Sequence, residues 1–224
     1  MSNTIHIKQK VHFLHIGKTG GSAIRSVLDK NGETSTHNII THGHATSIQS
    51  IPTGEKIIFF LRDPISRFIS GFYSRKRKGQ PRYNVEWKPL EKKIFTTFET
   101  PNELALALSD TKLSHHDLAI NAMDYVQHLR HYDNWYIDFE YFNSRLEDIF
   151  FIGFQESLDE DFVKLKAKLS IDSNSLLPTD NVGAHRNPEG LDKHLDSQAK
   201  EALLEHYKED IKFYNMCKTL VLKN

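Results

Sequence analysis

Residues 13–24, FLHIGKTGGSAI, decide the fold class of this chain. The apolar start indicates the end of a buried strand, the glycines indicate a tight loop, and the last residues indicate the start of a helix. Glycine lets backbone N–H groups approach a ligand closely, and a helix N-terminus carries partial positive charge. Lys18 adds a mobile cation, and Thr19 and Ser22 add hydroxyl donors. The stretch therefore predicts a site for a phosphate or sulfate ester, such as a nucleotide.

The loop differs from the Walker A motif, G-x-x-x-x-G-K-[ST]. Residues 17–19, GKT, match the end of that motif, but His12 stands five residues before Gly17, where the motif has glycine. The remaining glycines, Gly20 and Gly21, follow the lysine instead. A glycine-rich turn that binds nothing is the alternative at this point.

Composition favours an ordinary globular protein with a single domain over residues 1–224. The chain is 38% hydrophobic and 26% charged, and its 29 basic residues balance its 29 acidic ones. Zero net charge argues against a protein that binds nucleic acid or a membrane surface in general. The lone cysteine, Cys217, excludes an intramolecular disulfide. With no apolar run of transmembrane length and no signal-peptide pattern, we expect a cytoplasmic protein.

Apolar periodicity predicts strands that alternate with helices along the chain. The predicted strands are 10–16, 57–61 and 149–154. The predicted helices are 21–31, one from Pro64, 101–110, 117–130, 155–169 and 198–217, with loops over 33–55, 75–93 and 170–196. Alternation of this kind predicts an α/β fold with a central parallel sheet flanked by helices. Ligands of such sheets bind at the carboxyl ends of the strands, where the glycine loop and Arg62 fall.

A second motif, LRDPISRFISGFYS, covers residues 61–74. Asp63 can cap a helix, and Pro64 suits the first helical position. Arg62 at the strand end and Ser70 on the helix can hold one phosphate between them, because arginine offers a fork of donors and serine a hydroxyl.

Together the two motifs resemble the sulfotransferases that use 3'-phosphoadenosine 5'-phosphosulfate (PAPS). The resemblance implies a P-loop-like fold of three layers. It implies that the glycine loop holds the 5'-phosphosulfate and that an R-D-P-x-x-R-x-x-S pattern holds the 3'-phosphate. The residues that match the loop are Lys18, Thr19, Gly20, Gly21, Ser22 and Ala23, and those for the 3'-phosphate are Arg62 and Ser70.

The chain also resembles the carbohydrate branch of that family, which includes heparan sulfate and uronyl O-sulfotransferases. That branch carries an H-G-H segment, matched here by residues 42–44, whose second histidine is the base. Residues 149–169 and the loop VGAHRNPEG at 182–190 are similar as well, and Arg186 in that loop can close over the nucleotide. The chain lacks the anchor and disulfides of animal members, so it looks more like a soluble bacterial or phage member.

The resemblance implies transfer of a sulfuryl group from PAPS to a hydroxyl-bearing acceptor, a carbohydrate, which leaves 3'-phosphoadenosine 5'-phosphate (PAP). His44 would take the acceptor proton, Lys18 would stabilise the departing oxygen, and His42 would orient the acceptor. The scheme needs no metal, and the histidines show no zinc spacing. Three alternatives stay open: ordinary polar histidines at 42 and 44, a P-loop kinase or NTPase, and a degenerate nucleotide-binding module.

Overall fold

The computed structural model describes residues 8–109, 111–112, 114–180, 182–183, 187–188 and 190–223. The chain divides into two compact units, each made of two separate stretches. The first unit combines Met1–Leu61 with Trp135–Pro178, and the second combines Arg62–Asn134 with Thr179–Asn224. The single domain predicted for residues 1–224 stays a prediction, because one domain can contain two such units.

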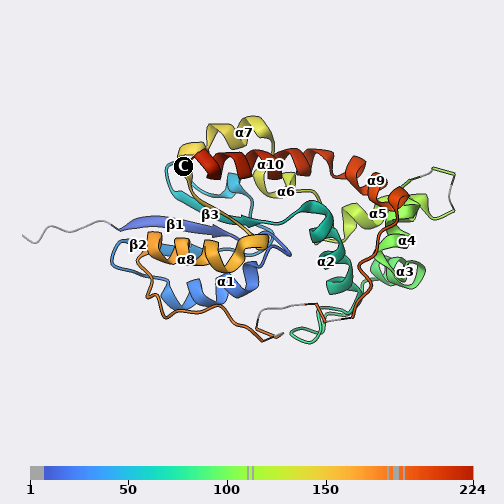
Figure 1. Ribbon diagram of the computed structural model, residues 1–224, viewed down its shortest axis with the longest axis horizontal. Helices are drawn as coiled ribbons and strands as arrows, with labels where there is room; N and C mark the ends of the chain where they lie inside the picture. The colour runs from blue at the N-terminus through green and yellow to red at the C-terminus, as the bar shows by residue number, and fades with distance from the viewer. Residues whose placement is uncertain are drawn as a thin grey trace, which may run out of the picture. The chain divides into compact units, whose positions relative to one another are not determined.

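The first unit is built on a four-stranded parallel sheet in the order β2-β1-β3-β4 (Figure 1). Its strands are β1 (Gln9–Leu14), β2 (His37–Thr41), β3 (Lys56–Leu61) and β4 (Ile149–Phe154). β1 pairs with β2 and β3, and β3 pairs with β4, all in parallel. The three predicted strands and the parallel α/β architecture are therefore confirmed. All four strands end at the same edge of the sheet.

Strand β2 corrects the prediction of a loop over residues 33–55. It is an edge strand of five residues, HNIIT, in which buried His37 and Ile39 alternate with exposed Asn38. Such a strand has no continuous apolar run to reveal it. It forms because its backbone pairs with β1, from Gln9 opposite His37 to Phe13 opposite Thr41.

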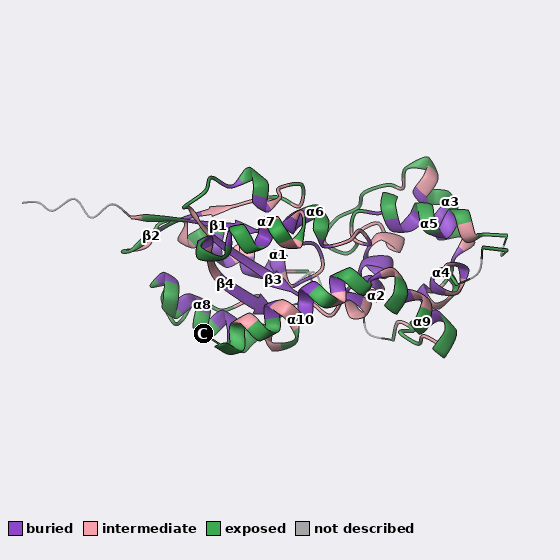
Figure 2. Cartoon of the chain, turned by 90° about the horizontal axis from the view of Figure 1, so that it is seen from above, coloured by how far each residue is buried: buried purple, intermediate pink, exposed green. Residues whose placement is uncertain are grey.

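Helices α1 (Gly21–Leu28) and α8 (Leu158–Leu169) cover one face of the sheet (Figure 1). Their apolar residues share one buried cluster with alternate residues of the strands, including Val11, Phe13, Ile58 and Phe60. On the opposite face, Phe142 of α7 (Phe139–Ser144) makes an edge contact with Phe59, at 6.1 Å between ring centroids. Burial on both faces explains why β3 and β4 are almost wholly buried (Figure 2).

The second unit is helical and has its own apolar core. Its helices are α2 (Pro64–Lys76), α3 (Pro89–Thr97), α4 (Pro101–Ala107), α5 (His116–Tyr125), α9 (Ser197–His206) and α10 (Lys208–Lys223), while α6 (Asp133–Tyr136) contains the boundary between the units. Phe68 and Phe72 of α2, Phe95 of α3, Leu104 of α4 and Leu203 of α9 meet in this core. None of the helices that the structure describes is both long and apolar enough to cross a membrane.

Several helix predictions need correction in extent. Residues 75–93 were predicted as a loop, but α2 continues to Lys76 and α3 begins at Pro89, where Glu91 accepts a hydrogen bond from the Lys88 N–H at 2.9 Å. The helix predicted over 198–217 is two helices, interrupted at Tyr207. The Tyr207 ring is fully buried and its hydroxyl donates to the Leu129 carbonyl at 2.5 Å, so tertiary packing sets the break.

The remaining helices begin or end within a turn or so of their predicted limits. Helix α1 stops at Leu28 and passes into a 3-10 turn, Asp29–Asn31. Helix α8 begins at Leu158 after a 3-10 turn, Gln155–Ser157. Helix α5 stops at Tyr125, so the last residues of the predicted 117–130 helix lie beyond it.

Candidate active site

The glycine loop connects the carboxyl end of β1 to the start of α1. Its backbone is left-handed at Lys18 (φ 69°) and at Gly20 (φ 84°). A left-handed conformation costs a residue with a side chain roughly 1–2 kcal/mol, so Lys18 holds a strained backbone. Thr19 is buried and braces the loop by donating from Oγ1 to the Ile16 carbonyl at 2.9 Å. Left-handed residues of this kind occur in loops that turn several amide groups toward an anion.

Gly21 allows the loop to pack against a histidine. A Cβ atom at this position would lie 2.3 Å from Cδ2 of His15, which no side chain tolerates. Gly21 opens α1, followed by Ser22 and Ala23, and the first turn of the helix holds no acidic residue. The N–H groups of Ala23 and Ile24 donate to the Gly20 carbonyl at 3.1 and 3.3 Å, and the amides before them are ones that a helix leaves without a partner of its own. The predicted loop residues 18–23 thus lie together at a helix start whose own first turn holds no acidic residue.

His44 lies beside the strand that leads into this loop. Its ring centroid is 4.0 Å from that of His15, and its Nδ1 lies 3.0 Å from the His15 carbonyl oxygen. The backbone carbonyl of His44 accepts a hydrogen bond from the Trp135 indole at 2.9 Å. The H-G-H segment therefore lies against the end of β1, and its backbone is held by the Trp135 contact.

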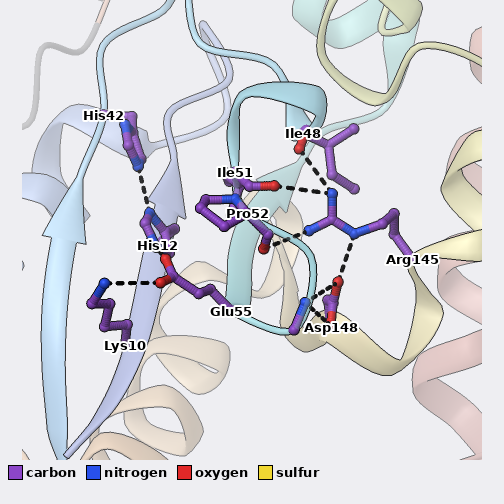
Figure 3. Close-up of polar contacts among 10 residues, drawn as sticks. Lys10, His12, His42, Ile48, Ile51, Pro52, Glu55, Arg145 and Asp148 are labelled. Atoms are coloured by element: carbon purple, nitrogen blue, oxygen red, sulfur yellow. Dashed lines mark hydrogen bonds and ion pairs between the residues drawn. The ribbon is translucent and has the colours of Figure 1, made fainter.

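His42 follows β2 directly, and its backbone N–H donates to the Phe13 carbonyl at 3.1 Å. Its ring lies edge to edge with that of His12, with the two ring planes 12° apart and His42 Nε2 2.8 Å from His12 Nδ1 (Figure 3). His12 Nε2 in turn lies 2.5 Å from a carboxylate oxygen of Glu55. Burial, together with the positive charges of His12 and Arg25, lowers the pKa of His42. His12 and Glu55 were not predicted as site residues, because only the register of β1 against β2, with His12 opposite Ile40, puts His12 on the same face as His42.

Arg62 is the first residue after β3 and begins the second unit. Its backbone is held by Tyr132, whose hydroxyl accepts from the Arg62 N–H at 3.1 Å and donates to the Arg62 carbonyl at 2.6 Å. The Arg62 guanidinium donates from Nε to Ser66 Oγ at 2.9 Å. Ser70 lies one turn further along α2 and is 8% exposed. Ser66 was not predicted as a site residue. It stands four residues before Ser70, so the two serines share a face of the helix, and this spacing could have pointed to it.

The start of α2 has the cap predicted for it. Asp63 Oδ1 accepts a hydrogen bond from the Ser66 N–H at 2.8 Å, and Pro64 is the first helical residue. Arg67 is fully buried, donates to the Arg130 carbonyl at 2.7 Å and lies over the Tyr132 ring at 4.6 Å. These contacts belong to the core of the second unit, so Arg67 holds the chain around Arg62.

Arg186 lies outside the described residues. Its described neighbour Asn187 hydrogen-bonds Arg77 through its side-chain oxygen, and its Nδ2 lies 3.5 Å from the Ser70 carbonyl. Arg82 donates to the Gly183 carbonyl at 2.7 Å. The described part of this loop is therefore attached to α2 and to the chain just after it, within the second unit.

A model of the sulfotransferase family matches residues 4–216. The chain belongs to the sulfotransferase family. The match covers the glycine loop, the H-G-H segment and the Arg62–Ser70 motif, and it gives no support to the kinase or NTPase alternative. A comparison with curated proteins found no significant match. Within the described part of this sulfotransferase-family chain, no group of three or more His, Cys, Asp or Glu side chains is arranged to hold a metal ion.

Proposed function

We propose that this chain transfers a sulfuryl group from PAPS to a hydroxyl of a carbohydrate acceptor, with PAP as the second product. Family membership supports sulfuryl transfer itself. The observation that carries the finer proposal is the contact between His44 Nδ1 and the His15 carbonyl, beside the glycine loop. This contact determines which nitrogen of His44 can take a proton.

His44 is the proposed base, acting through Nε2. A carbonyl oxygen only accepts hydrogen bonds, so Nδ1 of His44 must carry the hydrogen in that contact. In the neutral ring the lone pair is then on Nε2. This atom would take the acceptor's hydroxyl proton as the acceptor oxygen bonds to sulfur, which is the usual work of a general base.

The glycine loop fits the 5' end of the nucleotide. Lys18 and the backbone of Thr19, Gly20, Gly21, Ser22 and Ala23 would hold the 5'-phosphosulfate, since the loop joins left-handed backbone to a helix whose first turn holds no acidic residue. PAPS, when bound, supplies a sulfuryl group whose bond to a phosphate oxygen breaks as the new bond to the acceptor forms. Lys18 would stabilise the negative charge on that departing oxygen.

Arg62 and Ser70 would hold the 3'-phosphate. The Arg62 guanidinium is already oriented by Ser66, which reduces the entropy lost when it grips an anion. Ser66 joins the predicted pair because it directs the arginine. Arg186 is kept as a proposed contact over the nucleotide, on the family resemblance of the 182–190 loop.

Two measurements test the proposed function. Calorimetry should detect binding of PAP and much weaker binding of ATP with magnesium. Incubation with radiolabelled PAPS and a desulfated heparan sulfate oligosaccharide should label the oligosaccharide. Equal or tighter binding of ATP would contradict the nucleotide assignment, and tight PAP binding without transfer to any sugar hydroxyl would contradict the acceptor class.

A further inference from the structure

Three polar side chains form a hydrogen-bonded chain across one face of the sheet (Figure 3). His12 of β1 pairs in register with Ile40 of β2 and with Ile57 of β3. Side chains two residues apart in a strand point to the same face, so His42, just after β2, and Glu55, just before β3, flank His12. The row Glu55–His12–His42 is therefore set by strand register, and His12 at its centre is only 5% exposed.

The positions of the hydrogens in this row are set by Glu55, whose carboxylate stands at one end of it. Hydrogen bonds from Lys10 and His12 hold the pKa of the Glu55 carboxyl below its usual range, so it is ionised and only accepts. His12 must then donate from Nε2 to Glu55. In neutral His12 the lone pair lies on Nδ1, which accepts from Nε2–H of His42 at 2.8 Å.

We propose that Glu55 and His12 are positioning residues, which hold His42 with its hydrogen on Nε2 so that its Nδ1 accepts a hydrogen bond from the acceptor substrate. The role toward substrate rests on the proposed function, in which His42 orients the acceptor. The hydrogen arrangement itself rests on the contacts of the row alone. His42 and His44 then present opposite ring nitrogens as acceptors, Nδ1 and Nε2 respectively.

One added proton reverses the arrangement. When the His12–His42 pair takes up a proton, His12 can hold both its hydrogens, donating to Glu55 and to Nε2 of His42. Nδ1 of His42 then carries the hydrogen of the neutral ring and becomes a donor. Among the described residues, Lys10 and Glu55 lie at the His12 end of this pair, and Arg25 contacts the His42 carbonyl at 3.5 Å and Asp29 at 3.3 Å. In this state the Glu55 carboxylate contacts the ring that holds both hydrogens, because it hydrogen-bonds His12 and not His42.

Long-range proton–nitrogen NMR of the full chain, labelled with nitrogen-15, tests the arrangement without any substrate. At pH 8 the His42 signal should show the hydrogen on Nε2, and the His44 signal should show it on Nδ1. The substitutions His42→Gln and His44→Gln assign the two signals. A His42 ring with its hydrogen on Nδ1 at pH 8 would overturn the proposal.

Three variants test the role of the row. Glu55→Gln keeps a hydrogen-bond acceptor but removes the negative charge, so the pair should take up its proton at a pH lower by about one unit. His12→Asn keeps an acceptor for His42 and cannot titrate, so the His42 hydrogen should stay on Nε2 while the reversal at low pH disappears. Glu33→Gln is the matched control, because Glu33 is an exposed glutamate paired with Lys8 outside the row. An unchanged titration in Glu55→Gln would contradict the proposal.

The activity readout separates this inference from the proposed function. With PAPS and the desulfated oligosaccharide, Glu55→Gln should change the acceptor KM several-fold and move its acid limb to lower pH, with kcat changed much less. A change in kcat alone would contradict the positioning role. If no sugar is labelled by the unmodified protein, the proposed function fails, while the NMR result still decides the hydrogen arrangement of the row.

Discussion

The two histidines of the H-G-H segment, His42 and His44, differ in the groups that they contact. His44 donates to a backbone carbonyl, which cannot change its protonation, so one tautomer is fixed at every pH where the ring is neutral. His42 contacts a second imidazole backed by a carboxylate, so its tautomer depends on the charge of that partner. This difference at the residue scale supports a base role for His44 and an orienting role for His42.

We expect His44→Ala to lower sulfuryl transfer by roughly 100- to 10,000-fold, the usual worth of a positioned general base. Nucleotide affinity should stay unchanged, because no nucleotide contact is proposed for His44. Single-turnover transfer and PAP calorimetry measure the two effects. His194→Ala, which alters an exposed histidine, is the control. Near-normal transfer by His44→Ala with a collapse in His42→Ala would show that His42 is the base.

Arg62→Ala is expected to weaken PAP binding more than it slows the transfer step. The proposed 3'-phosphate contact is remote from the transferred group and is made equally before and during the reaction. Loss of a charge-assisted hydrogen bond costs about 1.5–3 kcal/mol, or roughly ten- to a hundredfold in affinity. Ser66→Ala, which only releases the arginine side chain, should have a smaller effect, and Arg130→Ala is the control. Unchanged PAP affinity in Arg62→Ala would remove this residue from the site.

At the scale of elements, the junction of β1 and α1 depends on the lack of a side chain at Gly21. We expect Gly21→Ala to destabilise the fold by about 1–3 kcal/mol, because the new Cβ would drive against the His15 ring. The His15 ring contacts the His44 ring, with centroids 4.0 Å apart, so transfer activity should fall as well. Urea unfolding measures the loss, and Gly32→Ala, whose Cβ would meet only ordinary contacts at 3.9 and 4.0 Å, is the control. Equal stability of the two variants would argue against this packing.

The end of α9 introduces a pH dependence into the second unit. Burial and the positive charge of His131 lower the pKa of His206 to about 4. Because its pKa is lower in the folded state than in the unfolded state, His206 contributes fully to the free energy of unfolding above pH 6.5. That contribution is lost as pH falls toward 4. The pKa of His131 is shifted the other way, because its hydrogen bond to Asp210 raises it. The contribution of His131 to the free energy of unfolding is therefore fully present below pH 6.5 and is lost as pH rises.

Between pH 7 and pH 5 His206 should lower the free energy of unfolding while His131 opposes that change, so His206→Gln should leave the chain relatively more stable at pH 5 than the unmodified chain is. Urea unfolding of both proteins at the two pH values gives the comparison. His194→Gln is the control, because that histidine is exposed. A change of the same size in His206→Gln would show that other groups carry the pH dependence.

At the scale of the whole molecule, the two predicted anion motifs belong to different units, with residues 18–23 in the first and Arg62 and Ser70 in the second. PAP carries a phosphate for each motif. At a concentration about a hundredfold above its dissociation constant, PAP should stabilise the folded chain by roughly 2.7 kcal/mol. Adenosine 5'-phosphate at the same concentration should stabilise less, because it lacks the 3'-phosphate. Equal stabilisation by both nucleotides in a thermal scan would argue against the Arg62 motif as a 3'-phosphate site.

Much of the fold could be predicted, because apolar runs such as IIFFL and IFFIGF are buried on both faces and leave a strong local signal. Strand β2 was not predicted, because it forms through pairing with β1. Helix α3 was not predicted either, because it begins at a capping interaction at Lys88. The single predicted helix over 198–217 failed at Tyr207, whose burial no local pattern reveals. The P-loop-like layering stays a prediction from family resemblance.

By itself the sequence determined the parallel α/β class, the glycine loop, the Arg62–Ser70 motif and the family, because each of these depends on residues close together in the chain. Only the tertiary structure decided which histidine nitrogen can accept a proton. His44 meets His15, His42 meets His12, and His12 meets Glu55, across separations of 29, 30 and 43 residues. Tautomers are set by such partners, and the partners are set by strand register, which forms only when the sheet is assembled.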